Sequence, residues 1–530
     1  MVAEVWDTLH EPGADGEHWS TDNVGEAAPG VLTPFGWSAW GPISDAMPRR
    51  IAQTMGIFSS DDIKSFPAIV RPFYGRIAIQ MEYLAAIGDR MPGTSGEAII
   101  ANMLGRVPGT MSFAATRRRY PLIACKLPIA MLAAPRLVRR EAPSVASWWH
   151  ARITTIPYAS MAEAVSALRE ALAKFDETLT LHSLALMSVV QPLLVALTEL
   201  IDGAGVGDVG ALSGSGGAEM AIIEDIWKAA RGTGSIDDVV SRHGFHGPLE
   251  GELSSHVWRE DSAPLERMIA SYRAVPDSES PLLRVRLAQE RLPELQREVL
   301  AALPRRRRPA ARLLLRIAAR TIPLRGVGKR SYLQSLDVAR CAGRRIGELL
   351  ASEGTLASPD DVFYLTVHEV GGPLPDNVSE LISLRRARRA EYQALDLPGN
   401  WQGTPVPLNR TRLANATQVI SGIGASSGVT EGQVRVVLDP SFDDVQPNEI
   451  LVTPTTDPSW ASIMFLSAAL VVDMGGMLSH AAVVARELGI PCVVNTRTGT
   501  HQLSTGDRVR VDGRAGTVEI LERAEQRSSA

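Results

Sequence analysis

The stretch VVDMGGMLSHAAVVARELGIP, residues 471–491, decides the fold of the C-terminal part of the chain. Its opening apolar residues are typical of a buried strand. Gly475 and Gly476 follow and permit a tight turn with close backbone approach. Ser479 is a favoured helix N-cap residue, so His480 is predicted at the first helical position. The closing Gly-Ile-Pro ends the helix.

This arrangement presents one imidazole at the N-terminus of a helix. Backbone N–H groups and the helix dipole favour an anion there, such as a phosphoryl group. Neutral imidazole is nucleophilic near pH 7, and a covalent phosphohistidine would divide one transfer into two steps. A lone histidine is usually structural, but this setting favours a phosphoryl carrier at His480. Arg486 and Glu487 fit an ion pair on the helix surface.

The motif GGMLSHAAVVARELGIP, residues 475–491, resembles the phosphohistidine swivelling domain of the phosphoenolpyruvate-utilising enzymes. This family includes phosphoenolpyruvate synthase, pyruvate phosphate dikinase and rifampicin phosphotransferase. TPTTDPSW (453–460) is similar to the Thr-x-Pro-x-Trp segment of the family, and GDRVRVDGRAGTVEIL (506–521) to its closing hairpin. The resemblance implies that His480 accepts and donates a phosphoryl group. It also implies phosphate contacts from Ser479, Gly475 and Gly476.

The first 400 residues resemble, more weakly, the substrate-binding domain of rifampicin phosphotransferases. RGVGKR (325–330) keeps a spacing in which Arg325 and Lys329 resemble a pair that clamps phosphate. The alternative is that both belong to the general basic run of residues 304–325. Gly326 and Gly328 weaken the prediction of a helix and favour a loop there.

A second motif of this region, HGFHGPLEGEL (243–253), offers candidates for substrate binding or for a general base. His246 takes the place of an arginine in the family pattern, and Glu252 takes the place of an aspartate. Glu250 holds the position of the family glutamate. These residues combine an imidazole with carboxylates. The alternative is that they cap turns and form ion pairs.

Composition sets limits on the class of protein. The chain has 530 residues, of which 45% are hydrophobic and 21% charged, so it predicts several ordinary globular domains. A net charge of −5 gives no general attraction to nucleic acid or to an anionic membrane. Three widely spaced cysteines predict no disulfide framework and no thiolate metal site. We therefore expect a soluble cytoplasmic protein with no bound metal.

The change of texture along the chain predicts a multidomain protein. A large, mainly α-helical substrate domain is expected over residues 1–400, and its first 45 residues lack periodicity, which predicts an irregular leader. Residues 401–414 read as a linker. An α/β swivelling domain is expected over residues 415–523, followed by a tail over residues 524–530.

The resemblance implies a phosphotransferase component. No Gly-rich nucleotide loop is found near the N-terminus, so we expect a separate ATP-grasp partner to phosphorylate His480, with ATP and Mg²⁺ bound to that partner. The acceptor would be a hydroxyl or carboxylate of a small molecule. The product would be a phosphoester or an intermediate activated for elimination or condensation. Two alternatives stay open: a non-catalytic regulatory phosphohistidine protein, and direct use of phosphoenolpyruvate.

Overall fold

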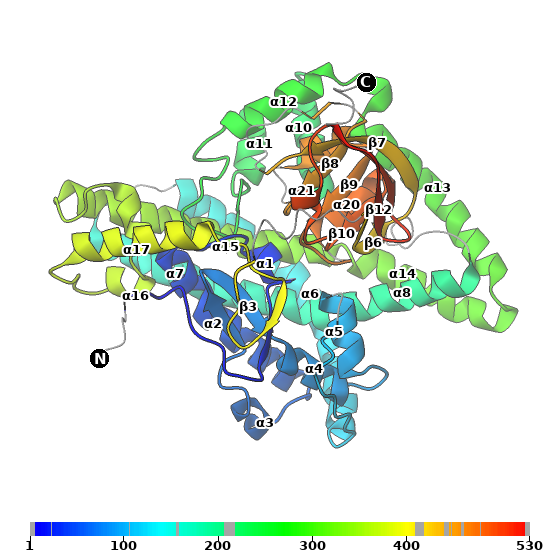
Figure 1. The fold of residues 1–530 in the computed structure, drawn as a ribbon, viewed down its shortest axis with the longest axis horizontal. Helices are drawn as coiled ribbons and strands as arrows, with labels where there is room; N and C mark the ends of the chain where they lie inside the picture. Colours follow the sequence, from blue (N-terminus) through cyan, green and yellow to red (C-terminus); the bar gives the residue numbers. More distant parts are fainter. Residues whose placement is uncertain are drawn as a thin grey trace. The chain divides into compact units, whose positions relative to one another are not determined.

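The computed structural model describes residues 6–524 apart from residues 23, 105–106, 155–157, 206–217, 409–417, 439–444, 447, 457–459 and 478. The chain divides into two compact units. The first unit comprises Met1–Ala185, Leu249–Ser255 and Gly328–Leu408, and the second comprises Leu186–Pro248, His256–Val327 and Asn409–Ala530. The expected fold class, mainly helical with a C-terminal mixed sheet, is confirmed (Figure 1).

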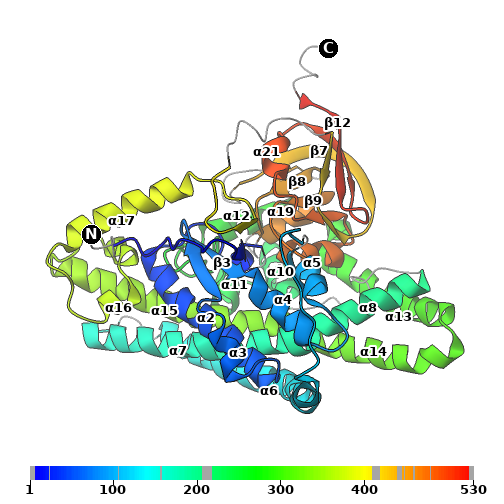
Figure 2. The same ribbon diagram turned by 60° about the horizontal axis from the view of Figure 1, so that its bottom comes forward.

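The first unit is built from helices around a small sheet. The four strands of the sheet are in the order β2-β3-β1-β4 and all pair antiparallel. The elements are β1 (His18–Ser20), α1 (Val24–Ala27), α2 (Pro34–Thr54), α3 (Ser60–Lys64), β2 (Val70–Phe73), β3 (Arg76–Gln80), α4 (Met81–Arg90), α5 (Gly96–Leu104), α6 (Tyr120–Thr154), α7 (Met161–Ala185), α15 (Leu324–Ser352, which begins in the second unit), η4 (Pro359–Tyr364), α16 (Val367–Val370), α17 (Val378–Gln393) and β4 (Asn400–Gln402). Helices α6 and α7 pack side by side (Figure 2).

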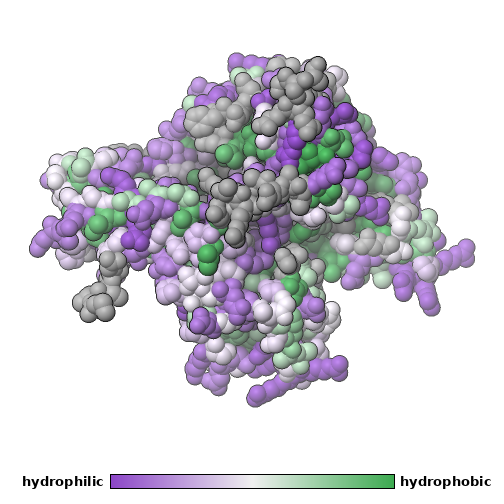
Figure 3. All heavy atoms as spheres, viewed as in Figure 1, coloured by the Kyte–Doolittle hydropathy of each residue, from purple (hydrophilic) through white to green (hydrophobic). Residues whose placement is uncertain are grey.

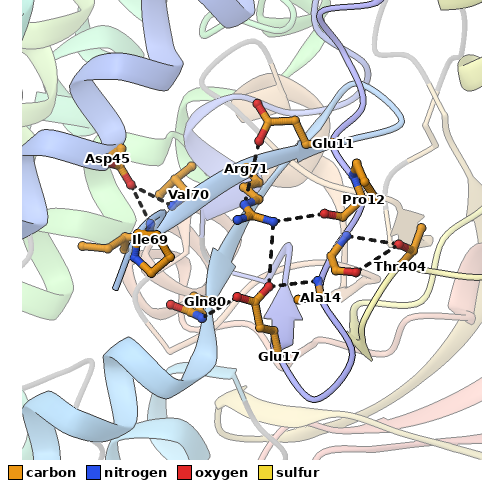
Figure 4. Close-up of polar contacts among 12 residues, drawn as sticks. Glu11, Pro12, Ala14, Glu17, Asp45, Ile69, Val70, Arg71, Gln80 and Thr404 are labelled. Atoms are coloured by element: carbon orange, nitrogen blue, oxygen red, sulfur yellow. Dashed lines mark hydrogen bonds and ion pairs between the residues drawn. The ribbon is translucent and has the colours of Figure 1, made fainter. Parts of the chain in front are cut away.

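The N-terminal segment is fixed to the small sheet through Arg71 of β2. Its Nη1 donates to the carbonyl oxygen of Pro12 at 3.0 Å, and its guanidinium lies 3.8 Å from the carboxylates of Glu11 and Glu17 (Figure 4). The same guanidinium stands over the ring of the buried Trp19, 5.3 Å from its centroid. A cation shared by two carboxylates and an aromatic face orders a segment that has little regular structure of its own.

Part of the predicted irregular leader is helical instead. Helix α2 begins at Pro34, with the Thr33 side chain accepting from the N–H of Gly36 as its N-cap. Proline at the first helical position is favourable because its fixed φ suits a helix. Its missing N–H costs no hydrogen bond there, because an N–H at this position has no partner within the helix. The expectation of irregular structure up to residue 45 was therefore wrong for α2, and also for β1 and α1 before it.

The second unit combines helices with an eight-stranded sheet. The strands are in the order β5-β12-β11-β7-β8-β9-β10-β6, and β7, β8, β9 and β10 run parallel to one another. The elements are η1 (Leu186–Val190), α8 (Gln191–Ala204), α10 (Ala218–Ala230), α11 (Ile236–His243), α12 (Ala263–Ala274), η2 (Asp277–Glu279), α13 (Pro281–Ala302), η3 (Arg305–Arg307), α14 (Arg308–Thr321), β5 (Val419–Ser421), β6 (Ile423–Ser426), β7 (Val429–Val436), β8 (Ile450–Thr453), α19 (Ala461–Leu466), β9 (Ala469–Val472), α20 (His480–Leu488), β10 (Cys492–Val494), α21 (Gly499–Gln502), β11 (Arg508–Asp512) and β12 (Thr517–Glu522).

One apolar core joins the sheet of this unit to helices that lie far away in sequence. It includes Trp258, Leu265 and Tyr272 together with Phe465 and Ala481. The rings of Tyr272 in α12 and Phe465 in α19 have centroids 5.9 Å apart. In Figure 1 the green helices α10 and α12 accordingly lie beside the orange strands. The C-terminal sheet is therefore packed on the helices of its own unit.

The predicted domain boundaries differ from this division. The helical region expected over residues 1–400 is shared between the two units, because residues 186–248 and 256–327 belong to the second. Residues 409–414 of the predicted linker lie outside the described residues, as do residues 525–530 of the predicted tail.

Apolar side chains also reach the surface of the protein, as the green atoms in Figure 3 show for one face. Among the described residues, two helical stretches are long and apolar enough to span a membrane: Tyr120–Thr154 and Met161–Ile201. Only 28% and 33% of their most apolar parts are buried in the protein. Core helices of globular proteins satisfy the same two criteria, but such helices are mostly buried.

Candidate functional site

His480 is the first residue of α20, as the sequence predicts. Ser479 has extended backbone angles (φ −59°, ψ 160°), and its Oγ accepts a hydrogen bond from the N–H of Ala482 at 3.2 Å. Gly489 ends the helix in the left-handed conformation at φ 66°. His480 is buried, with 5% of its surface exposed. The side chain therefore lies within the fold at the positive end of a helix dipole.

The glycine turn before the helix has the geometry that requires glycine. Gly475 has φ 135°, a backbone conformation that side chains with a Cβ rarely adopt. The carbonyl oxygen of Gly476 accepts from the N–H of Ser479 at 3.0 Å, which closes the turn. Gly475, Gly476 and Ser479 thus form the backbone immediately before His480. Their predicted contact with phosphate remains a prediction.

A threonine that sequence reasoning did not single out contacts the imidazole. The Oγ1 of Thr456 lies 3.2 Å from Nδ1 of His480. Thr456 follows strand β8, and the loop after β8 is fixed to the end of β9 because Met474 N–H donates to the carbonyl oxygen of Pro454 at 2.9 Å. If Nδ1–H donates to Thr456, the imidazole carries its lone pair on Nε2. Thr456 lies in the quoted segment TPTTDPSW, so the motif was seen and its role was not.

Arg486 holds the loop that precedes His480. Its Nε donates to the carbonyl oxygen of Ala425 in β6, and its Nη1 donates to that of Met477, each at 2.7 Å. Both of these bonds go to backbone carbonyl groups, and the surface ion pair expected between Arg486 and Glu487 stays a prediction. The side chain of Glu487 lies outside the described residues. A guanidinium between two carbonyl groups ties α20, β6 and the glycine turn together.

Asp473 fixes the other side of the turn. It follows β9, and its carboxylate accepts from Thr496 Oγ1 at 2.7 Å and from the N–H of Gly499 at 2.6 Å, with Thr500 a third donor. Burial raises the pKa of Asp473 above its ordinary value, although these hydrogen bonds lower it. The residue connects the end of β9 to the start of α21. These bonds hold together the segment before the glycine turn and the start of α21.

Arg325 and Lys329 both lie in α15, so the expected loop at Gly326 and Gly328 was wrong. Glycine is required at residue 328 because a Cβ there would lie 2.6 Å from Nδ1 of His182, which packs against this turn of the helix. Lys329 forms an ion pair with Glu250, with Nζ 2.7 Å from Oε1. The structure thus brings two predicted site residues together in the first unit, whereas Arg325 belongs to the second unit.

Glu252 caps a helix, which was the alternative reading of the sequence. Its carboxylate accepts from the N–H of Thr33 at 3.0 Å and from Thr33 Oγ1 at 2.7 Å, at the start of α2. It also accepts from the N–H of Ser254 at 2.9 Å. A Cβ on Gly36 would lie 2.7 Å from this carboxylate, so glycine makes room for it. A buried carboxylate at a helix N-terminus is a stabilising arrangement.

His246 belongs to the second unit, whereas Glu250 and Glu252 belong to the first. It is buried in an aromatic group, with its ring centroid 4.3 Å from that of Phe245 and 5.7 Å from that of Trp258. Its carbonyl oxygen accepts from the N–H of Trp258 at 2.7 Å. These contacts fit a packing role, and the role of His246 as a base stays a prediction.

Within the described part of the chain, no group of three or more His, Cys, Asp or Glu side chains is placed to hold a metal ion. A buried histidine at a helix N-terminus, oriented by a threonine hydroxyl and preceded by a glycine turn, is suited to hold a phosphoryl group covalently.

Comparisons with known proteins agree with this geometry. Residues 445–516 match the family described as "PEP-utilising enzyme, mobile domain", and residues 224–326 match the "Rifampicin phosphotransferase fourth domain". The predicted resemblance to the phosphoenolpyruvate-utilising enzymes is confirmed. The second match extends the similarity to the segment that includes α11, α12, α13 and α14 of the second unit.

Three relatives illustrate the extent of the similarity. An uncharacterized protein of Mycobacterium tuberculosis is 35% identical over 288 residues, which is 53% of this chain and 31% of that protein. An uncharacterized phosphotransferase of Bacillus subtilis is 35% identical over 197 residues (34% of this chain, 23% of that protein). The rifampicin phosphotransferase of Streptomyces sviceus is 36% identical over 180 residues (33% and 20%). The aligned part of this chain thus spans less than a third of each curated relative.

Proposed function

We propose that this chain is the phosphoryl-carrying and acceptor-binding component of a phosphotransferase. His480 takes a phosphoryl group that originates from ATP and passes it to a hydroxyl or carboxylate of a small molecule. The observation that carries this proposal is the position of His480 at the start of α20, with Nδ1 beside Thr456, inside a segment that matches the mobile domain. The relatives named as phosphotransferases support the same class of reaction.

The chemistry follows from the imidazole. Nε2 of His480 attacks the phosphorus, the bond to the donor oxygen breaks with its electron pair, and a phosphohistidine forms. In the second step an acceptor oxygen attacks the phosphorus, and the N–P bond breaks and returns its electron pair to Nε2. A hydroxyl acceptor releases its proton to water, whereas a carboxylate acceptor has none to release. Thr456 orients the ring through Nδ1 in both steps. Arg486 keeps the preceding loop in place through the carbonyl group of Met477.

The donor is proposed to be a separate protein. A cytoplasmic ATP-grasp partner binds ATP and Mg²⁺ and phosphorylates His480, so that neither cofactor is held tightly by this chain. The product is a stable phosphoester or an activated intermediate that goes on to eliminate or condense. Rifampicin is the first acceptor to test, because it is named in the description of several relatives.

The test is radiolabel transfer to the full chain. The protein is incubated with β- or γ-labelled ATP and a candidate ATP-grasp protein, and separately with labelled phosphoenolpyruvate. We expect label that is stable in base, lost in acid and dependent on ATP with the partner. His480→Ala should abolish it, whereas His501→Ala, a change at an exposed histidine in the same unit, should leave it unchanged.

The outcomes separate the rival functions. Label from phosphoenolpyruvate alone would replace the proposed donor. Label that stays on the protein in the presence of rifampicin and of a panel of small hydroxy and carboxylic acids would favour a regulatory phosphohistidine. No label from any donor would refute the carrier role altogether.

A further inference from the structure

Helix α6 presents an apolar stripe to solvent. Leu122, Ile129 and Leu132 follow one another at helical spacing and are 37%, 67% and 61% exposed. Cys125 is exposed on the same stripe. The opposite face of the helix is buried and packs against α2 and α7. The helix is therefore supported on one side, and large apolar side chains project from the other over roughly 15 Å, at 1.5 Å per residue.

Cations bracket this stripe at both ends. Arg117 and Arg118 precede it, Arg136 and Arg139 follow it, and all four are exposed. Between residues 98 and 140 the sequence has eight lysines and arginines and no aspartate or glutamate, although the whole chain carries −5. This segment is therefore positively charged although the net charge of the whole chain is negative. A surface with exposed apolar residues between clusters of cations is typical of a helix that lies in a lipid interface.

Other features of α6 favour lying on a membrane over crossing it. The helix is long and apolar enough to span a bilayer. However, it contains Pro128, Pro135 and Pro143, and its inner face is already occupied by protein. Cations at intervals along the outer face would be costly at the centre of a bilayer but are favourable beside headgroups.

We propose that the outer face of α6 docks this protein on an anionic lipid surface. Ile129 and Leu132 enter the boundary between headgroups and acyl chains, and the flanking arginines contact anionic headgroups. A bilayer offers both partners at once, an apolar layer beneath a layer of negative charge. A second copy of the chain fits this face less well, because it would bring two clusters of like charge together. This proposal is independent of the phosphotransfer reaction.

The cysteines of the chain provide a direct probe. Cys125 lies on the stripe and is exposed, whereas Cys341 and Cys492 are buried. A thiol-reactive, environment-sensitive dye should therefore label Cys125 selectively in the full-length protein. With vesicles of phosphatidylcholine containing 30% phosphatidylglycerol we expect a blue shift of the dye and co-sedimentation of unlabelled protein. Pure phosphatidylcholine vesicles should bind at least ~10-fold less, and added salt should weaken binding.

Variants separate α6 from other basic surfaces. Ile129→Asp with Leu132→Asp should lower the partition coefficient by ~100-fold, and Arg136→Gln with Arg139→Gln by ~10-fold or more. Val406→Asp, at an exposed apolar residue elsewhere in the first unit, is the matched control and should bind normally. Arg312→Gln with Arg316→Gln, on the exposed face of α14, should also bind normally.

Three results would overturn the proposal. The first is no difference between anionic and neutral vesicles. The second is normal binding by the double aspartate variant at residues 129 and 132, or an equal loss of binding by the α14 variant. The third is a concentration-dependent dimer, detected by light scattering, that the double aspartate variant abolishes, because this would assign the stripe to a second copy of the chain.

Discussion

Replacing Arg486 by methionine should loosen the loop that carries His480. The substitution removes two hydrogen bonds to carbonyl oxygens, from Nε to that of Ala425 and from Nη1 to that of Met477, both at 2.7 Å, and a weaker contact of Nη2 with Met477 Sδ at 3.6 Å. A hydrogen bond from a charged group contributes about 1.5–3 kcal/mol, so the pair sums to about 3–6 kcal/mol. Because Arg486 is half-buried, water can replace part of this, and we expect a loss of about 2–4 kcal/mol.

The assay for this variant is native-state hydrogen exchange followed by mass spectrometry. The amides of α20 should lose protection by that amount, and the rate of phosphate labelling at His480 should fall because the imidazole is less well positioned. Arg486→Lys retains one donor group and should show about half of the effect. The control is Arg510→Met on β11, whose ion pairs with Glu431 and Glu519 are exposed and screened by water, so their loss should change stability little. If Arg486→Met costs no more than Arg510→Met, the positioning role is wrong.

Two further predictions concern the first unit and are checked by urea unfolding. Burial by itself raises the pKa of Glu369, but its hydrogen bonds with Arg385 hold the pKa below the ordinary value of 4.5. The interaction therefore stabilises the fold above about pH 4.5 and is lost as the pH falls through the lower folded value, so Glu369→Gln should destabilise at pH 7 and match the wild type in acid. An equal deficit at both pH values would contradict this. Lys329→Met should cost about 3–5 kcal/mol, because Glu250 is 6% exposed and loses its cation at 2.7 Å. Adding Glu250→Leu should recover most of that loss, and a deficit unchanged in the double variant would show that the ion pair is not its cause.

The features predicted best from the sequence are those set by neighbouring residues. The strand, the glycine turn, the Ser479 cap and the helix after His480 lie within about twenty residues, and each depends on local backbone preference. The loop expected at Gly326 and Gly328 failed for the opposite reason. Both glycines are helical, and Gly328 leaves room for His182, nearly 150 positions earlier; no local rule reveals that contact.

Contacts between residues far apart in the chain also could not be predicted from the sequence. Glu252 was a candidate base, but the structure shows that it caps α2 through Thr33, more than 200 positions away. For Arg486 the sequence offered only a surface pair with Glu487, and it did not reveal the bonds to carbonyl groups in β6 and in the glycine turn. Periodicity shows which face of an element is buried but not which distant group meets it.

The core shared by α12 and the C-terminal sheet has a kinetic consequence for the carrier role proposed for His480. A carrier must visit a donor and an acceptor, and here the sheet that bears His480 is seated on helices through contacts such as Tyr272 with Phe465. Separation of the sheet from these helices would expose both rings to water. The rate of separation therefore falls as the apolar area of the interface grows. Dissociation of this interface would then limit the rate of the transfer cycle, and its side chains would set the turnover rate without contacting the substrate.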